Sequence, residues 1–401
     1  MEHVGTVEIY GACRPVEATR RVVVVITGIE DFGIRTVLLA QFLHAERGRI
    51  SFSYLASQDG DCAKALRAAS ASVHIVGGEI PRGHPGHPVL LPFFWIRSLP
   101  RLYQTYTGVR RIVQKMPCDI LYAHSYYGLV ICRLAARRLS CRVVCHLHKN
   151  LSETRLAGLQ RILASLAIAA LADRLVAISD FVAATLWGPA RQKACRVDNG
   201  VDVRAIMALV RGVAKDPHRI VVVGRLQTWK KQQVAIRAIG ILRDRGIDCD
   251  LEIIGGRGLA SDRHERMLQD MIDALELADH VRFAGVISPP YHRIATAVAC
   301  VSCATREPFG LVVIEAAACG TAVVAADAGA TAELIEDGKT GLLFRRDDPV
   351  ALADALERLL RDSALRDALA EAARQRVLER YDISNHLNAL RSCFDEILAR
   401  Q

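Results

Sequence analysis

The sequence predicts an α/β protein made of two doubly wound domains, each with a parallel sheet between layers of helices. Short runs rich in valine and isoleucine alternate with segments whose apolar residues recur at helical spacing, and this pattern restarts after about residue 205. The apolar runs are nearly continuous, as expected for strands covered on both faces. A chain of 401 residues is long enough for two domains that each bury a core.

The first domain is predicted over residues 1–205. Its strand candidates are the runs 21–26, 119–123, 142–146 and 174–178. The run 21–26 reads RVVVVI and leads through a glycine-containing turn into an apolar-faced helix that reaches residue 43. Because ligands of open parallel sheets bind beyond the carboxyl ends of the strands, polar residues just after these runs are candidates for a functional site.

The second domain is predicted over residues 206–382, after a linker near residues 205–217. Its strand candidates are the runs 219–223, 250–254, 281–284, 297–302 and 322–326. A helix between the first two is indicated by apolar residues at helical spacing, namely Val234, Ala235, Ala238, Ile239 and Leu242. The last segment, 383–401, is predicted to be a helix that packs back onto the first domain.

The net charge is +9, and all of this excess lies in the first domain. Residues 1–205 contain 26 lysines and arginines against 15 acidic residues, so this half offers a positive surface to an acidic partner. The first 21 residues have no apolar segment typical of a signal peptide, and the uncharged run 162–172 is too short to cross a bilayer. We therefore expect a cytoplasmic protein with reduced thiols, rather than a secreted disulfide scaffold or an integral membrane protein.

The segment 221–231, VVVGRLQTWKK, places two cations after a predicted strand. Gly224 ends the strand, Arg225 lies at its carboxyl end and Lys230 opens the next helix. Both side chains can converge on one anionic group, because only a short loop separates them. A diphosphate suits them, since arginine binds phosphate bidentately and lysine supplies a compact charge. The alternative is that both are solvated surface cations.

The segment 305–320, TREPFGLVVIEAAACG, carries two carboxylates, Glu307 and Glu315. Gly310 and Leu311 are predicted to lie where the loop enters a helix, so that their N–H groups favour a phosphate. Glu315 lies one helical turn after Leu311 on the same face, whereas Glu307 stays on the loop. Paired carboxylates suit sugar hydroxyls as acceptors, but they also suit the acid–base hydrolysis of a glycoside. The spacing alone does not choose between these chemistries.

These motifs resemble those of glycosyltransferase family four, the retaining nucleotide-sugar transferases of GT-B fold, in which two Rossmann-like domains face a cleft. The matching stretches are EPFGLVVIEA at 307–316, GRL…K at 224–230, NGVD at 199–202, AISDFVAATL at 177–186 and ELIEDGKTGLLF at 333–344. The resemblance implies a metal-independent enzyme that moves a hexose or N-acetylhexosamine from a nucleotide diphosphate sugar to a hydroxyl. A UDP-sugar is the favoured donor and GDP-mannose the next.

The resemblance also implies a role for each donor-site residue. Arg225 and Lys230 would bind the diphosphate, Glu315 the nucleotide ribose, and Glu307 the hydroxyls of the transferred sugar. Backbone contacts to sugar and phosphate would come from Phe309, Gly310 and Leu311. No cofactor and no metal is implied, because the two cations and a helix N-terminus replace the divalent ion that other sugar transferases use.

In the first domain, the resemblance points to a histidine and a glycine loop. His148 follows a predicted strand and matches a histidine that touches the donor sugar in many relatives. His124, after the preceding strand, is a second candidate on the acceptor side, and a buried structural histidine is the alternative for each. Gly28 and Gly33 occupy the place of a glycine-rich phosphate loop. Two departures from the family pattern are Lys231, where a glycine is usual, and GATAE at 329–333, where Gly-Gly-x-Pro-Glu is usual.

The acceptor is expected to be a saccharide, a lipid-linked saccharide or a small molecule, in surface polysaccharide or glycoconjugate synthesis. Residues 89–115 mix aromatic side chains with arginines, which indicates a peripheral contact with an anionic membrane; the alternative is a core helix with a solvated basic edge. Nucleic acid is not expected as a partner, because no helix concentrates the charge. Core packing is expected for Cys300 and Cys303, and no metal site for the pair His84 and His87.

Two other functions remain open on the same fold. One is a non-catalytic protein that binds a sugar nucleotide, and the other is an epimerase or a phosphorylase. The fold alone does not decide among them, because unrelated activities share it.

Overall fold

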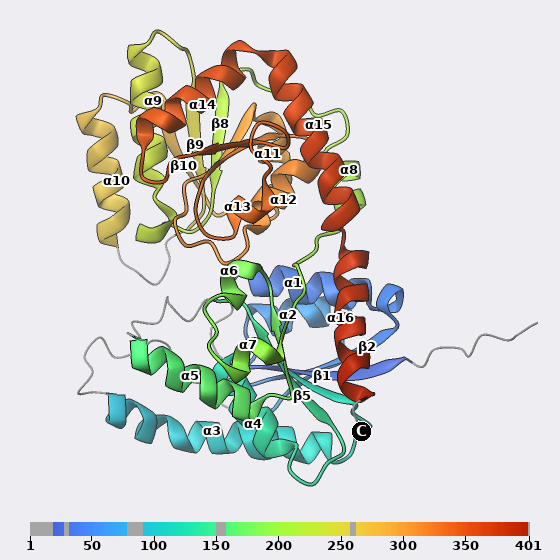
Figure 1. Ribbon diagram of the computed structural model, residues 1–401. Coiled ribbons are helices and arrows are strands. Elements are labelled where there is room, and N and C mark those ends of the chain that lie inside the picture. Colours follow the sequence, from blue (N-terminus) through green and yellow to red (C-terminus); the bar gives the residue numbers. More distant parts are fainter. Residues whose placement is uncertain (1–18, 28–31, 78–90, 150–157, 257–261, 400–401) are drawn as a thin grey trace, which may run out of the picture.

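The computed structural model describes residues 19–27, 32–77, 91–149, 158–256 and 262–399 (Figure 1). These residues form two parallel sheets, each flanked by helices, and the last helix of the chain lies on the first domain. The predicted fold class, two doubly wound parallel-sheet domains, is confirmed.

The first sheet has seven parallel strands in the order β3-β2-β1-β4-β5-β6-β7. The strands are β1 (Arg20–Ile26), β2 (Ile50–Ala56), β3 (Val73–Ile75), β4 (Ile120–Ala123), β5 (Arg142–Leu147), β6 (Arg174–Ala177) and β7 (Ala194–Arg196). The helices of this domain are α1 (Phe32–Leu43), the 3-10 helix η1 (Ala45–Gly48), α2 (Asp61–Ala68), α3 (Leu91–Val113), α4 (Tyr126–Ala135), α5 (Gly158–Leu171), α6 (Asp180–Ala183) and α7 (Pro189–Lys193).

The second sheet has six parallel strands in the order β10-β9-β8-β11-β12-β13. They are β8 (Arg219–Val223), β9 (Asp250–Ile254), β10 (Val281–Gly285), β11 (Ala299–Ser302), β12 (Ala322–Ala326) and β13 (Leu342–Phe344). The remaining helices are α8 (Val203–Leu209), the 3-10 helix η3 (Thr228–Lys230), α9 (Gln232–Asp244), α10 (Asp262–Ala274), α11 (Tyr291–Thr296), α12 (Leu311–Ala318), α13 (Thr331–Leu334), α14 (Pro349–Arg361), α15 (Ser363–Arg380) and α16 (Ile383–Leu398).

Four strands were not among the sequence candidates, namely β2, β3, β7 and β13. Strand β2 reads ISFSYLA, so serines interrupt its apolar run even though it lies inside the sheet between β1 and β3. The other three have three residues each and lie at sheet edges. Short edge strands carry too little apolar periodicity to stand out in a sequence.

Helix α16 lies against the first domain. Its buried apolar side chains, among them Leu387, Leu390 and Phe394, share a core with alternate residues of β1 and β4. The ring of Phe394 meets that of Tyr122 edge-on, with 5.4 Å between centroids. An ion pair of 2.6 Å between Arg20 and Asp395 ties the far end of the helix to β1. The chain therefore crosses between the domains twice, near Val201 and near Asp382, and these two crossing segments pair through an isolated β-bridge.

The fold brings the carboxyl ends of particular strands to the domain interface. Strand order reverses between β1 and β4 in the first sheet and between β8 and β11 in the second. Ligands of doubly wound sheets bind at such switch points, because the loops there diverge to opposite faces. Every candidate residue follows one of these strands or a direct neighbour. No helix in the described part of the chain is long and apolar enough to cross a membrane.

Candidate active site

The two charged motifs of the second domain meet in one ion pair. Lys230 lies in η3, after β8, and Glu307 lies on the loop after the neighbouring strand β11. The Nζ of Lys230 donates to Oε2 of Glu307 at 2.6 Å, and both side chains are largely buried. The same Nζ lies 4.6 Å from the ring centroid of Trp229. A cation and a carboxylate are thus held together at the sheet edge, where a ligand with both phosphate and hydroxyl groups can bind to them.

The backbone after β8 is held by close contacts. Gly224 has a φ of +152°, and the neighbouring Gly255 has a φ of +153°. A Cβ atom on Gly255 would lie 2.0 Å from the carbonyl oxygen of Gly224, so only glycine allows this approach of β8 and β9. The amide of Gln232 donates to the carbonyl of Arg225 at 2.9 Å. This contact fixes the backbone of Arg225 directly beyond the strand.

Helix α12 begins at Leu311, as the sequence predicts, and Gly310 caps it with a φ of +105°. Glu315 lies inside this helix and is buried, and its burial raises the pKa of the carboxyl group from 4.5 to about 7. In the described part of the chain this carboxylate makes no hydrogen bond or ion pair, so it can accept from a ligand. The side chain of Phe309 is buried beside the ring of Tyr381, which leaves only its backbone for a ligand.

The loop that carries Glu307 rests on a second glycine. Gly329 has a φ of +62°, and a Cβ atom there would lie 2.8 Å from both the nitrogen and the carbonyl oxygen of Glu307. The N–H of Ala330 donates to that carbonyl at 2.9 Å. The segment after β12 therefore sets the position of the Glu307 backbone. This segment, GATAE at 329–333, departs from the family pattern, but it keeps a glycine at position 329, where the close contact requires one.

Gly33 places the first domain opposite helix α12. It lies in the first turn of α1, and a Cβ atom on it would lie 3.4 Å from Cδ1 of Leu311. The N-termini of α1 and α12 therefore converge across the domain interface, and their helix dipoles add positive potential there. Gly28 lies outside the described residues.

His124 and His148 lie next to each other at the ends of β4 and β5. Nδ1 of His124 is 2.8 Å from Nε2 of His148. A third ring, His146, has its centroid 4.2 Å from that of His148, and its Nδ1 is 2.7 Å from the hydroxyl of Tyr122. Burial, and after it the neighbouring imidazoles, lower the pKa of His124 and His146 well below 6.5. Both rings are therefore neutral at pH 7.

The two domains are joined by direct contacts beside the Glu307 loop. The hydroxyl of Ser179 donates to the carbonyl of Pro308 at 2.6 Å. The carboxylate of Glu333 accepts from the N–H groups of Asp180 and Phe181 at 3.0 and 2.6 Å, which caps the start of α6. Nη1 of Arg196 lies 2.9 Å from the same carboxylate. These contacts set the position of the first domain relative to the loop that carries Glu307.

Comparisons with known proteins agree with the motifs. A family model described as "Glycosyl transferases group 1" matches residues 209–376, and one described as "Glycosyltransferase Family 4" matches residues 60–205. A D-inositol 3-phosphate glycosyltransferase of Actinosynnema mirum is 34% identical over 340 residues, which cover 76% of this chain and 80% of that protein. The chain belongs to glycosyltransferase family four. A protein of the same name from Thermobifida fusca is 33% identical over 231 residues, and that alignment spans 51% of each chain.

Solved structures place this glycosyltransferase in the GT-B fold. Anabaena Alr3699/HepE in complex with UDP and glucose has a TM-score of 0.77 at 20% identity, covering 94% of this chain and all of that one. Sucrose-phosphate synthase from Thermosynechococcus elongatus has a TM-score of 0.74 at 17% identity, covering 95% of this chain and 100% of that chain. At these identities the similarity concerns the fold.

Two residues of the glycosyltransferase's site region were missed by sequence reasoning. His146 was overlooked beside His148, although a His-x-His pair on a strand puts both rings on one face. Glu333 was noted only as part of a family motif, and nothing in the sequence shows that it reaches the first domain. The pair Cys300 and Cys303 is buried on opposite sides of the second sheet, in two separate cores, as expected. The pair His84 and His87 lies outside the described residues.

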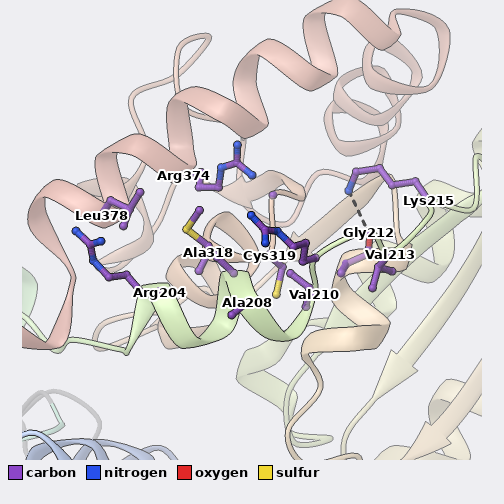
Figure 2. Close-up of a pocket in the computed structure, with 14 residues that line it drawn as sticks. Arg204, Ala208, Val210, Gly212, Val213, Lys215, Ala318, Cys319, Arg374 and Leu378 are labelled. Atoms are coloured by element: carbon purple, nitrogen blue, oxygen red, sulfur yellow. Dashed lines mark hydrogen bonds between the residues drawn. The ribbon is translucent and has the colours of Figure 1, made fainter.

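A cavity of about 770 Å³ lies at the other end of α12, away from Glu307 (Figure 2). Its lining is basic, with Arg204, Arg211, Lys215 and Arg374. The Nζ of Lys215 donates to the carbonyl of Ala297 at 3.1 Å, and burial lowers its pKa to about 8. This lysine therefore ties the segment before β8 to the residues before β11, and the cavity is separate from the candidate donor site.

Proposed function

We propose that this glycosyltransferase transfers a hexose or N-acetylhexosamine from a nucleotide diphosphate sugar, with a UDP-sugar favoured, to an acceptor hydroxyl with retention of configuration. The observation that carries the proposal is the contact of Lys230 with Glu307 beside the N-terminus of α12. Lys230 and Arg225 would hold the diphosphate, and Glu307 would accept hydrogen bonds from the sugar. Glu315, one turn into the helix, would accept from the ribose hydroxyls. A UDP-bound neighbour of the same fold supports this choice of nucleotide.

The proposed reaction uses the protein to position groups and to stabilise charge. The bond from the anomeric carbon to the diphosphate breaks, and the acceptor oxygen forms a bond to that carbon on the same face. The acceptor proton passes to the leaving phosphate oxygen. Arg225, Lys230 and the converging helix N-termini would stabilise the charge that develops on the diphosphate, so that no divalent metal is needed there. His148, at the end of β5, would contact the transferred sugar.

For the acceptor, a phosphorylated polyol is the first class to test. The curated relatives described above are named D-inositol 3-phosphate glycosyltransferases. A phosphorylated acceptor also suits the positive charge of the first domain. A saccharide or a lipid-linked saccharide is the second class, in polysaccharide or glycoconjugate synthesis.

The test is a transfer assay with UDP-glucose, UDP-N-acetylglucosamine and GDP-mannose against inositol phosphate, saccharide and lipid-linked acceptors. Nucleotide release gives the rate, and NMR of the product gives the anomeric configuration. We expect acceptor-dependent release, a product with the donor's configuration, and activity in EDTA. An epimerised free sugar would identify an epimerase, and phosphate-dependent cleavage of a glucan would identify a phosphorylase. Donor binding without turnover against the whole panel would identify a binding protein.

We also propose that the outer face of the first domain makes a peripheral contact with an anionic membrane. Helix α3 exposes Leu99 and Tyr103, and α5 exposes Leu159 and Leu163, each by more than half. Helix α4 contacts both α3 and α5, so the three helices form one layer. Arg111, at the end of α3, is exposed and can approach acidic headgroups. Apolar anchors beside arginines are the combination that interfacial helices use.

Sedimentation with liposomes tests this contact. The double variant Arg110→Glu/Arg111→Glu should lower the fraction bound to anionic liposomes. Arg358→Glu/Arg361→Glu, which makes the same charge change on α14 of the second domain, is the matched control and should bind like wild type. Equal sedimentation of both variants would contradict the membrane contact and favour the alternative, in which α3 is a core helix with a solvated basic edge.

A further inference from the structure

Three histidines of the first domain lie together, and the proposed transfer reaction uses only one of them, His148. The parallel register of β4 and β5 places His124, just past the end of β4, alongside His146 of β5. Side chains alternate along a strand, so His146 and His148 share a face of the sheet. One ring nitrogen from each of the three histidines lies within 4.8 Å of the others. The two strands thus gather three imidazoles at one point of the sheet's carboxyl edge.

Two of these rings carry a buried nitrogen without a partner. Nε2 of His124 and Nε2 of His146 are buried and make no hydrogen bond within the described part of the chain. The other nitrogen of each ring is engaged, with His148 and with the hydroxyl of Tyr122 respectively. A buried polar nitrogen without a partner costs free energy, so such atoms call for a ligand or an ion that uses the lone pair.

The surroundings of the cluster suit a metal ion. Neutral imidazole is a common ligand of zinc, and three histidines are the protein ligands of a zinc site whose fourth position stays open. The Tyr122 hydroxyl, 2.7 Å from Nδ1 of His146, is the kind of outer contact that fixes a ring and directs its other nitrogen at the ion. His148 is only half-buried, which gives an ion access from outside.

We propose that His124, His146 and His148 form a binding site for a divalent transition-metal ion, with Zn²⁺ as the expected ion. Each imidazole gives one nitrogen, and the fourth position takes water or an anionic group. Each neutral ring coordinates through a lone pair and keeps its one proton on the other nitrogen, so the rings themselves release no proton on binding. The site belongs to the first domain and is separate from the donor diphosphate, for which the sequence predicts no metal.

A fourth histidine nearby does not belong to the set. His386, on α16, lies with its ring centroid 6.3 Å from that of His146. Its Nε2 is 2.8 Å from the amide nitrogen of Gln41, and its Nδ1 is 2.7 Å from the carbonyl of Asp198. Both of its nitrogens are therefore used within the protein, and His386 serves to hold α16.

The test is metal titration of the full chain after dialysis against a chelator. Isothermal calorimetry with Zn²⁺ in two buffers of different ionisation enthalpy gives the stoichiometry, the affinity and the number of protons released. Co²⁺ is the spectroscopic probe, because four-coordinate Co²⁺ absorbs visible light far more strongly than the hydrated ion. We expect one tightly bound ion per chain, no proton released by the imidazoles, and the visible bands of a four-coordinate site.

Variants locate the ion. His146→Asn should weaken Zn²⁺ binding by more than about 100-fold, and Tyr122→Phe, which removes only the outer hydroxyl, by about 10- to 100-fold. His148→Gln, at a half-buried position, keeps the test decisive if the buried His146 variant does not fold. The double variant His84→Gln/His87→Gln removes two histidines that lie three residues apart in the sequence, and as the control it should bind like wild type.

Each other outcome contradicts the proposal. If the folded wild-type protein does not bind one Zn²⁺ ion tightly, the three histidines are packed structural residues. Unchanged affinity in both His146→Asn and His148→Gln places the ion elsewhere. Loss of binding in the control variant alone assigns it to the segment around residues 84–87. The result does not depend on sugar transfer, so it stands apart from the proposed function.

Discussion

At the scale of single residues, the proposed transfer reaction depends on the ion pair of Lys230 with Glu307. We expect Lys230→Ala and Glu307→Ala each to lower kcat/KM by about 100-fold or more, because each removes a preorganised charge at the reacting sugar diphosphate. Steady-state kinetics with the best donor and acceptor measure the loss, and thermal melting checks the fold.

The neighbouring Lys231→Gln is the matched control for this pair. Lys231 pairs with Asp347 at 2.9 Å, on the exposed side of the loop. We expect the kcat/KM of Lys231→Gln to stay within a few-fold of the wild-type value. Normal turnover in Lys230→Ala or Glu307→Ala would contradict the role proposed for that residue.

Glu315 gives the protein a predicted pH dependence. Its folded-state pKa of about 7 lies above the ordinary value of 4.5, so the folded chain holds the proton more tightly than the unfolded chain. The free energy of unfolding should therefore fall as pH rises from about 4.5 to 7 and then level off, with a loss on the order of 3 kcal/mol. Glu315→Gln cannot ionise and should escape this loss.

Urea unfolding between pH 5 and pH 8 measures the difference. The stability of Glu315→Gln relative to wild type should improve from pH 5 to about 7 and then stay constant. The exposed Glu46→Gln is the control for removal of one carboxylate. Parallel pH profiles for Glu315→Gln and wild type would mean that the carboxylate is not buried in solution.

At the scale of elements, the glycine after β12 is expected to control the Glu307 loop. Gly329→Ala combines a positive φ with a Cβ atom 2.8 Å from the Glu307 backbone, whereas Gly338→Ala has a similar φ of +72° and open space around it. We expect both variants to lose about 1–2 kcal/mol of stability from backbone strain. Only Gly329→Ala should also lose transfer activity, because only there must the loop move. Equal activity of the two variants would contradict this role.

Much of the element pattern could be predicted from the sequence, and the reasons differ from one place to another. The runs at 219–223, 250–254 and 322–326 match β8, β9 and β12 to the residue, because buried parallel strands read as continuous apolar segments. Strand β2 was missed because serines break its run. Lys231 looked like a departure from the family, and the structure gives the reason for the usual glycine, since its φ is +56° at the start of α9.

The contacts between side chains in the site were harder to predict from the sequence. Arg225, Lys230, Glu307 and Glu315 could be assigned to one edge of the sheet, because their motifs follow predicted strands. The carboxyl ends of parallel strands lie at the same edge. The gathering of His124, His146 and His148 depends on the register between two strands, which no local pattern encodes. The contact between Glu333 and α6 depends on how the domains are placed, which is set by the whole fold.

At the scale of the whole molecule, Glu333 is expected to hold the two domains in the arrangement that the structure shows. Glu333→Ala removes the contacts to Asp180, Phe181 and Arg196, so this arrangement of the domains should become less populated. We expect KM for the donor to rise by roughly tenfold with a smaller change in kcat, because the chemical groups remain in place. Glu336→Ala, which breaks an ion pair with Arg376 inside the second domain, is the control. Equal KM values for the two variants would contradict the role of this contact.

The most direct test of the central claim, a nucleotide-sugar site between the domains, is a thermal shift with UDP, GDP, ADP and dTDP. A ligand at 100 times its Kd adds about 2.7 kcal/mol, which is easily seen as a rise in Tm. We expect one base to raise the Tm, in EDTA as well as without it, and Arg225→Ala/Lys230→Ala to abolish the rise. No shift with any nucleotide in a cooperatively folded sample, or an unchanged shift in the double variant, would contradict the account.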